Sequence, residues 1–304
     1  MKVYLKRGDD SLTIVVFFDR ISEVVRGRSW SFGSGDGRRK MKRIIVVTGA
    51  SSGLGKEFVV QISKKEKVDE VWAIARRTDR LEELASLVDV KIVPLSIDLS
   101  DGAAISAYKQ KLEEEKPEIV VLANCAGYGK FGHYETIPTE THINMINLNC
   151  EAAIYMTDYS LPYMKEGSKI LNVASCAGFQ PIPYINVYGA TKAFMVSYTR
   201  ALNRELKYRK IHVVALCPFW SKTEFFNRAI KEGEKPVVIH YSAMYEPSFV
   251  VSKAIRALYG KTDICVPGGK NKFQWFLTKL FNHRFVMNVW MKMQKLDGTK
   301  EIRK

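Results

Sequence analysis

The sequence predicts an α/β fold: a doubly wound parallel sheet of seven strands with helices on both faces. Residues 43–48 form a continuous apolar run, which is typical of a parallel strand covered on both sides. A glycine-rich turn over residues 48–55 follows this strand and opens a segment of helical periodicity. Strand-length and helix-length segments then alternate as far as residue 267. At 304 residues with 46% hydrophobic content, the chain is long enough to bury a large core.

The expected elements follow one another in a regular order. The predicted strands are residues 43–48, 70–75, 90–95, 118–123, 169–174, 211–216 and 263–266. The predicted helices are residues 53–65, 79–87 and 101–116, two helices within 142–164, and then 187–208 and 248–259. Because parallel strands are joined by right-handed crossovers, these helices are expected to cover both faces of the sheet.

The ends of the chain differ from this central part. Residues 1–40 are expected to be an extension without a fold of its own, since their apolar run is short and residues 33–37 read as a glycine-rich connector. A further hypothesis is that residues 37–40 translate a ribosome-binding site, which would make Met41 the native start. The predicted catalytic domain is residues 41–267, and residues 268–304 form a basic helical tail.

Composition narrows the class of protein. The net charge is +15, and residues 261–304 alone carry 10 Lys and Arg against 3 Asp and Glu. Attraction to anionic lipid, nucleic acid or an acidic carrier remains open beside an ordinary solvated surface, but no nucleic-acid module accompanies the charge. Five widely spaced cysteines without a metal-ligand pattern predict reduced, buried thiols and a cytoplasmic protein that holds no metal. No run approaches the ~20 apolar residues of a membrane span.

The glycine-rich turn predicts a dinucleotide site. Gly49, Gly53 and Gly55 stand between the first predicted strand and its helix. Backbone N–H groups and the positive end of a helix favour a pyrophosphate at such a turn, and glycine lets the backbone approach it closely.

The residues after the second predicted strand indicate NADP(H). An acidic residue there would bind the adenosine ribose of NAD, whereas arginine accommodates a 2′-phosphate. This chain has Arg76 and Arg77 and no acid. We expect Arg76 to contact the phosphate, with Arg77 and Ser51 in support; the alternative is that both arginines are only solvated.

Three further residues predict proton transfer at an oxygen atom. Tyr188 and Lys192 are four residues apart, on one face of a helix, and Ser175 lies thirteen residues before Tyr188. A phenol has an ordinary pKa of roughly 10, so we expect the Lys192 ammonium to lower the pKa of Tyr188. Ser175 would hydrogen-bond the carbonyl or alcohol oxygen while a hydride moves at the adjacent carbon.

Taken together, these motifs resemble the short-chain dehydrogenase/reductase family, in its compact single-domain branch with a Rossmann-type fold. The resemblance covers about residues 41–267. It implies a catalytic set of Asn149, Ser175, Tyr188 and Lys192, where Asn149 is preferred to Asn147 for its spacing to Leu161-Pro162. It implies cofactor contacts from Gly49, Ser51, Ser52, Gly53, Leu54, Gly55, Arg76, Arg77, Asp98, Leu99, Asn124, Ala126, Gly127, Tyr188, Lys192, Pro218 and Thr223. Two positions depart from the family pattern: Cys125 replaces an asparagine, and Phe219 replaces a glycine beside the nicotinamide.

The implied activity is NADP(H)-dependent interconversion of a ketone and a secondary alcohol. An apolar substrate (steroid, fatty-acyl or aromatic) is favoured because aromatic and apolar residues crowd two predicted loops, among them Phe179, Ile182, Tyr184, Phe219, Trp220, Phe225, Phe226, Tyr241, Met244 and Tyr245. The alternatives are a 3-oxoacyl-thioester reductase acting on an acyl carrier and a non-catalytic NADP(H)-sensing protein. The family also implies a homodimer or homotetramer.

The tail has a pattern of its own. Apolar residues recur at helical spacing over residues 273–293, with Lys and Arg between them. Such a basic amphipathic helix can lie on a membrane surface, cap the substrate cleft or form a subunit contact. We expect it to pack on protein, and peripheral membrane contact stays the alternative.

Overall fold

The computed structural model describes residues 2–8, 11–17, 41–230, 236–241 and 243–296. The chain forms two compact units, residues 1–40 and 41–304. In the first unit, β1 (Lys2–Gly8) pairs antiparallel with β2 (Ser11–Phe17). The sequence analysis predicted no strands here, although β-branched residues such as those at 13–16 favour extended backbone. The hypothesis that Met41 is the native start stays a prediction.

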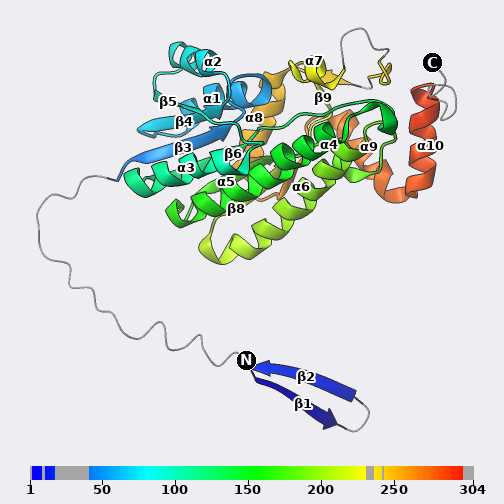
Figure 1. Ribbon diagram of the computed structural model, residues 1–304, viewed down its shortest axis with the longest axis horizontal. Coiled ribbons are helices and arrows are strands. Elements are labelled where there is room, and N and C mark those ends of the chain that lie inside the picture. The colour runs from blue at the N-terminus through cyan, green and yellow to red at the C-terminus, as the bar shows by residue number, and fades with distance from the viewer. Residues whose placement is uncertain (1, 9–10, 18–40, 231–235, 242, 297–304) are drawn as a thin grey trace, which may run out of the picture. The chain divides into compact units, whose positions relative to one another are not determined.

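The second unit contains the predicted parallel sheet of seven strands (Figure 1). Its strands run in the order β11-β8-β7-β6-β3-β4-β5. They are β3 (Arg43–Thr48), β4 (Glu70–Ala75), β5 (Lys91–Ser96), β6 (Glu118–Asn124), β7 (Lys169–Val173), β8 (His212–Leu216) and β11 (Ile264–Cys265). The chain builds outward from β3 to β5 and then returns to β6 on the other side of β3. This reversal makes the β3–β6 pair the topological switch point, where open α/β sheets bind ligands.

Helices cover both faces of this sheet, as predicted. Strand β3 shows why: Ile45 and Val47 face one hydrophobic cluster, whereas Ile44 and Val46 face another. The first cluster is completed by α1 (Gly53–Lys65), α2 (Thr78–Glu82) and α8 (Pro247–Leu258). The opposite face is covered by α3 (Gly102–Glu115), α5 (Ala152–Ser160) and α6 (Asn186–Glu205).

Several helices differ in detail from the sequence prediction. Before α5, helix α4 (Thr139–Ile146) runs into a π-helical turn at Asn147–Glu151, and a 3₁₀ turn at Leu161–Tyr163 follows α5. Helices α2 and α6 likewise end in 3₁₀ turns, at Glu83–Ser86 and Leu206–Arg209. Helical periodicity did not reveal these changes because one extra or missing residue per turn hardly alters a short apolar pattern.

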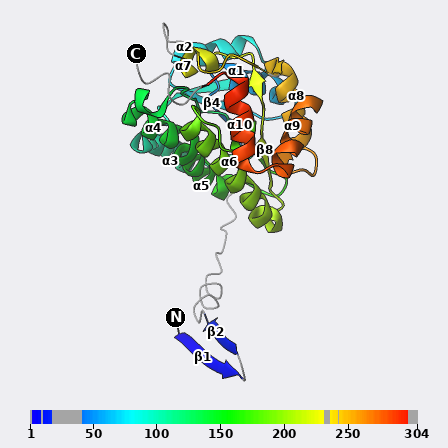
Figure 2. The same ribbon diagram turned by 90° about the vertical axis from the view of Figure 1, so that its right-hand side faces the viewer.

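The prediction of one amphipathic helix in the tail was wrong. The structure has two helices, α9 (Gly269–Leu280) and α10 (His283–Met293), which lie at the same end of the second unit (Figure 2). Asn282 begins the second helix, since its side chain accepts a hydrogen bond from the Phe285 backbone N–H at 2.9 Å. A capping asparagine therefore interrupts a continuous apolar pattern.

Three short elements were not predicted. Strands β9 (Trp220–Ser221) and β10 (Met244–Tyr245) form a separate parallel pair, and α7 (Phe225–Ala229) lies between them in the chain. Each is too short for a periodic pattern. Together they carry much of the aromatic segment that the sequence analysis assigned to the substrate side.

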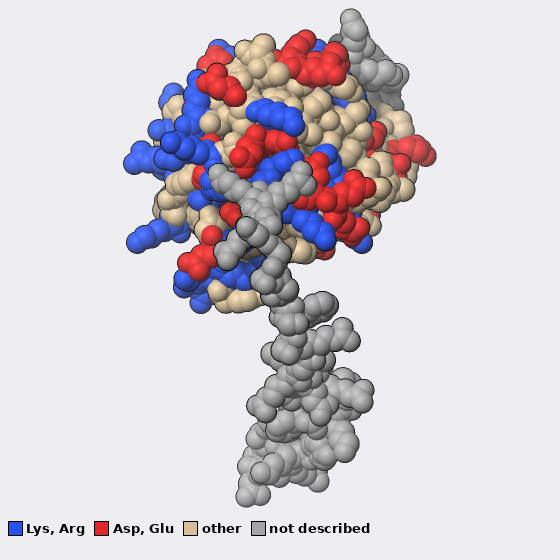
Figure 3. Space-filling view, turned by 90° about the vertical axis from the view of Figure 1, so that its left-hand side faces the viewer, with Lys and Arg blue, Asp and Glu red and all other residues tan. Residues whose placement is uncertain are grey.

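Surface charge, the cysteines and the helices can be compared with what the composition predicted. Acidic and basic side chains are interspersed on the face that Figure 3 shows. Of the five free cysteines, four are buried and Cys125 is partly exposed, so buried thiols are confirmed for the four. Among the described residues, no helix combines the length and the apolarity that crossing a membrane requires.

Glu70, buried at the start of β4, is the centre of an ionic cluster. Its carboxylate accepts hydrogen bonds from Lys91 at 2.9 Å and from the Trp72 indole at 3.0 Å, and it pairs with Lys42 at 3.1 Å. Burial opposes ionisation, but these donors outweigh it and lower the pKa of Glu70 to about 2.

The substitution Glu70→Gln should lower the free energy of unfolding at pH 7 by roughly 1–3 kcal/mol. Because the folded pKa lies below the ordinary value, this contribution exists above pH 4.5 and disappears as the pH falls towards about 2. The free energies of unfolding of the wild type and the variant, measured with urea from pH 7 downward, should therefore converge. Glu113→Gln, at an exposed pair with Lys109, is the matched control and should change stability by less than about 0.5 kcal/mol. A Glu70→Gln difference that stays constant with pH would contradict this account.

Candidate active site

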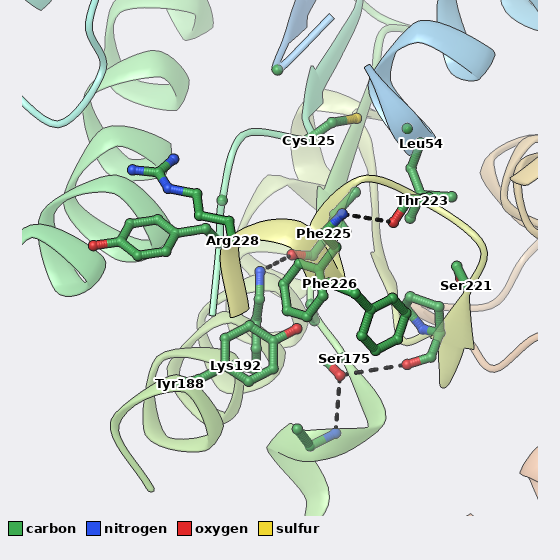
Figure 4. A pocket seen from close by; sticks show the side chains of 18 of the residues that line it. Leu54, Cys125, Ser175, Tyr188, Lys192, Ser221, Thr223, Phe225, Phe226 and Arg228 are labelled. Atoms are coloured by element: carbon green, nitrogen blue, oxygen red, sulfur yellow. Dashed lines mark hydrogen bonds between the residues drawn. The ribbon is translucent and has the colours of Figure 1, made fainter. Parts of the chain in front are cut away.

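A cavity of about 700 Å³ opens at the switch point (Figure 4). It is bounded by the segments that follow the carboxyl ends of β3, β4, β5, β6, β7 and β8. The predicted site residues that line it are Gly49, Ser51, Ser52, Gly53, Leu54, Gly55, Arg76, Arg77, Asp98, Leu99, Ala126, Gly127, Ser175, Tyr188, Lys192, Pro218 and Thr223. Asn124 and Asn149 do not line it. The sheet topology thus brings together residues that are far apart in the sequence.

The glycine-rich turn has the tight geometry that the sequence predicts. Gly49 has φ +64° and Gly53 has φ +53°, in the left-handed region that favours glycine. A Cβ on Gly55 would come within 2.3 Å of the Gly49 carbonyl oxygen. The turn therefore presents bare backbone at the start of α1, and this fits a pyrophosphate held by N–H groups.

Two groups of charged residues surround the far end of the cavity. Arg77 donates to the Ser51 hydroxyl at 3.3 Å and pairs with Glu224 at 3.2 Å; Arg80 also contacts Glu224. Arg76 instead faces Asp98, with 3.7 Å between guanidinium and carboxylate. Arg77 therefore lies beside Ser51, whereas Arg76 lies beside Asp98, another of the predicted cofactor contacts. The residues present fit a dinucleotide with an additional phosphate at this end.

Ser175, Tyr188 and Lys192 lie near one another in the cavity (Figure 4). Ser175 begins the 3₁₀ turn Cys176–Phe179, where its Oγ accepts a hydrogen bond from the Ala177 N–H at 3.1 Å. Tyr188 and Lys192 extend from α6, and the Lys192 Nζ lies 5.7 Å from the centre of the Tyr188 ring. The same Nζ donates to the Val173 carbonyl at 2.8 Å, which fixes the ammonium at the end of β7.

The structure does not show the expected lowering of the Tyr188 pKa by Lys192. Burial raises the pKa of Tyr188 to about 12, although hydrogen bonding with Ser175 opposes the rise. Burial also lowers the pKa of Lys192 to about 8. Desolvation is the largest cause of the shift in the pKa of Tyr188, and the Lys192 ammonium is held by the Val173 carbonyl. At neutral pH Tyr188 is therefore protonated and ready to donate.

Asn149 and Asn124 lie behind the cavity wall. Asn149, in the π-helical turn, donates to the Tyr128 carbonyl at 2.8 Å and accepts from the Tyr128 N–H at 3.0 Å. It also donates to Thr191 at 3.0 Å and so ties the loop after β6 to α6. Asn124 donates to Asn172 at 2.9 Å, between neighbouring strands. Both side chains therefore hydrogen-bond and position segments that line the cavity.

The structure adds lining residues that the sequence analysis did not name. Arg228 extends from α7 over the Tyr128 ring, with 3.8 Å between the guanidinium carbon and the ring centre. Phe131 contacts both Tyr188 and Phe225 at ring separations of 6.1 and 5.9 Å. No motif marks these residues, because their role depends on how α7 packs against the loop after β6. Among the described residues, no cluster of His, Cys, Asp or Glu could hold a metal ion.

The tail closes one side of the cavity. Trp275 of α9 packs on Phe179 with ring centres 5.5 Å apart, and the Trp290 indole of α10 donates to the Pro183 carbonyl at 3.1 Å. Both tryptophans line the cavity. The inner face of α9 and α10 therefore packs on the chain's own cleft, in agreement with the contact that we expected for the tail.

A parallel sheet with a glycine turn, serine, tyrosine and lysine at its switch point defines an oxidoreductase of the nicotinamide-dependent class. Residues 43–234 match the family model for short chain dehydrogenases, and the chain belongs to this family.

Named relatives support the same class. An NADP-dependent 3-hydroxy acid dehydrogenase of Schizosaccharomyces pombe is 35% identical over 191 residues, which cover 60% of this chain and 73% of that protein. A very-long-chain 3-oxoacyl-CoA reductase of Anas platyrhynchos is 30% identical over 261 residues, covering 82% and 79%. A short-chain dehydrogenase from Sphingobium yanoikuyae, solved in complex with NADPH, has a TM-score of 0.67 at 25% identity and covers 85% of this chain and 98% of its own.

The substitution Gly55→Ala should weaken nucleotide binding at least about tenfold, because the new Cβ meets backbone rather than a movable side chain. Fluorescence titration with NADPH measures the change. Gly269→Ala is the matched control, since a Cβ there meets nothing within 4 Å at the start of α9. Equal binding by the Gly55→Ala variant and the control would show that the close approach in this turn is not needed.

Proposed function

We propose that the protein is an NADP(H)-dependent oxidoreductase that interconverts a ketone and a secondary alcohol on an apolar substrate. The observation that carries the proposal is the convergence of Ser175, Tyr188 and Lys192 in one cavity with aromatic walls. The chain has both Tyr188 and Lys192, and this disfavours a protein that binds NADP(H) without turnover.

The roles of the residues follow from their chemistry and their places. When bound, the nicotinamide supplies or accepts the hydride. Tyr188, protonated at neutral pH, gives its proton to the carbonyl oxygen in the reduction direction and takes one back in oxidation. The Ser175 hydroxyl donates a hydrogen bond to the same oxygen. Lys192 would hold the nicotinamide ribose, and Asn149 keeps α6 and the loop after β6 in register.

Positive charge at the far end supports NADP(H). Arg76 and Arg77 line the cavity, Arg80 lies beside them, and of these Arg77 is the one next to Ser51. Glu224, from the segment before α7, partly neutralises Arg77 and Arg80. A 2′-phosphate would replace or join this carboxylate as the partner of the guanidinium groups.

The walls favour an apolar substrate. Phe131 packs on Trp220 and Phe225, with ring centres 6.2 and 5.9 Å apart, and Phe225 packs on Tyr188. The second candidate is a 3-oxoacyl-thioester reductase. It would reduce a ketone by the same chemistry but on a narrower class of substrates. It is favoured by the similarity to very-long-chain 3-oxoacyl-CoA reductases. Following NADPH oxidation with a panel of steroid, aromatic and 3-oxoacyl-thioester ketones separates these substrate classes.

The substitution Tyr188→Phe should reduce kcat by at least about 10²-fold, because it removes the positioned proton donor and keeps the ring. The affinity for NADPH should stay nearly unchanged. Stopped-flow turnover and fluorescence titration of the same preparation measure the two quantities. Tyr198→Phe, on the same helix outside the cavity, is the matched control and should keep the wild-type kcat. Wild-type turnover by Tyr188→Phe would exclude the proposed mechanism and favour the sensing protein.

Arginine substitutions test the cofactor preference. Arg76→Ala and Arg77→Ala should each weaken NADPH binding by about one to two decades, the scale of one charge-assisted contact worth roughly 1.5–3 kcal/mol, and change NADH binding much less. Arg204→Ala, an exposed arginine on α6, changes the charge equally and should affect neither cofactor. If both variants lose NADPH and NADH affinity equally, these arginines do not read the 2′-phosphate.

A further inference from the structure

The outward side of the two tail helices is apolar. We define the outer face as Phe273, Phe276, Leu280, Phe281, Phe285 and Val289. All six side chains are exposed, and Phe273 and Leu280 expose 63% and 61% of their surfaces. Positions 273, 276 and 280 share one side of α9, and positions 285 and 289 share one side of α10. Single exposed apolar residues are ordinary, but six along one pair of helices need an explanation.

The outer face is continuous across the bend between the helices. The rings of Phe281 and Phe285 lie 4.9 Å apart, which joins the end of α9 to the first turn of α10. Figure 2 shows the two helices together at the end of the unit that faces the viewer. The Phe281–Phe285 contact therefore links the exposed apolar residues of the two helices.

The inner side of these helices contacts the rest of the domain. Asn271 and Gln294 are buried; Asn271 donates to the Pro267 carbonyl at 2.7 Å, and Gln294 accepts from the Ile239 and His240 N–H groups at 2.8 and 2.9 Å. With Trp275 and Trp290 also turned inward, the helices cannot rotate to bury the outer face without losing these contacts.

The charged residues of this segment of the chain have one sign. Residues 269–296 contain no Asp or Glu. The cations there are Lys270, Lys272, Lys279, Arg284, Lys292 and Lys295. The surface in Figure 3, in contrast, mixes acidic and basic groups. A segment that combines exposed apolar side chains with cations and no acid complements a lipid surface with anionic headgroups, because the apolar groups enter the headgroup boundary while Lys and Arg meet the phosphates.

A groove lies beside the bend between α9 and α10 and adjoins the catalytic cavity. It is lined by Phe281, Asn282 and His283 at the bend and by Phe179, Trp275 and Thr278 deeper in. The last three residues also line the catalytic cavity. The groove therefore shares Phe281 with the outer face and three lining residues with the cavity where an apolar substrate would be held.

We propose that the outer face of α9 and α10 docks on an anionic lipid bilayer, lying in its interface without crossing it. The occupant is lipid rather than a second copy of the chain, because six cations and no acid on this segment would repel the same surface of another copy. The proposal concerns the surface and stands whether or not the proposed activity is correct.

Vesicle sedimentation of the full chain tests the docking. We expect binding to vesicles of phosphatidylcholine with about one third phosphatidylserine, at least about tenfold stronger than to phosphatidylcholine alone. Binding should weaken as salt rises from about 0.1 M to about 1 M, since the screening length falls from about 10 to about 3 Å.

Two double variants separate the contributions of apolar contact and charge. Phe276→Ser with Phe285→Ser removes apolar contact, and Lys279→Glu with Arg284→Glu reverses charge; each should weaken binding at least about tenfold. Leu87→Ser with Tyr208→Ser is the matched control, because both side chains are exposed elsewhere, and it should bind like the wild type. Thermal unfolding verifies that each variant is folded, independently of any enzymatic activity.

Several outcomes would overturn the proposal. One is that the wild type sediments equally with both vesicle compositions, or with neither. Another is that both double variants bind like the control. A third is that sedimentation equilibrium finds a dimer that the Phe276→Ser, Phe285→Ser variant dissociates while vesicles bind nothing. That third result would assign the outer face to a second copy of the chain.

Discussion

The pairing of β3 with β6 is the constraint on which the rest of this structure depends. Their register places Thr48 opposite Asn124, so both strands end at the same level of the sheet. The Thr48 hydroxyl then accepts hydrogen bonds from the Cys125 and Ala126 N–H groups at 3.0 and 3.1 Å. One buried oxygen thereby joins the glycine turn to the loop after β6. A Cβ on Gly49 would come within 2.8 Å of the Ala126 nitrogen, which shows how closely the two segments approach.

Hydrogen bonds hold the reactive side chains of the site in place relative to the β3–β6 pair. Asn149 holds the loop that follows Gly127 and also holds Thr191, the residue before Lys192. Lys192 is in turn held by the carbonyl at the end of β7. The donors and acceptors of the site are therefore preorganised by strands and helices of the core, as electrostatic stabilisation of a developing charge requires. The cost is desolvation, which shifts the pKa values of Tyr188 and Lys192 in opposite directions.

Elements outside the sheet complete the lining of the cavity. Helix α7 and the tail helices contribute Phe225, Arg228, Trp275 and Trp290, and none of these belongs to the sheet. In a family whose core is shared, such additions determine which substrates can enter. The tail has apolar side chains on two sides, one turned to the cavity and one turned outward.

The sequence by itself determined the sheet, its strands and most of the residues around the cavity. Apolar runs and a glycine turn are local signals, and a Tyr-x-x-x-Lys spacing fixes two side chains on one helix face, so no tertiary information was needed. Only the tertiary structure decided that Asn124 and Asn149 lie behind the wall, that Arg77 rather than Arg76 neighbours Ser51, and that Arg228 enters the site. It also decided that burial dominates the pKa of Tyr188, and that the tail is two helices. These outcomes depend on which groups meet across the fold and how much water they lose, and neither is encoded in the spacing of residues along the chain.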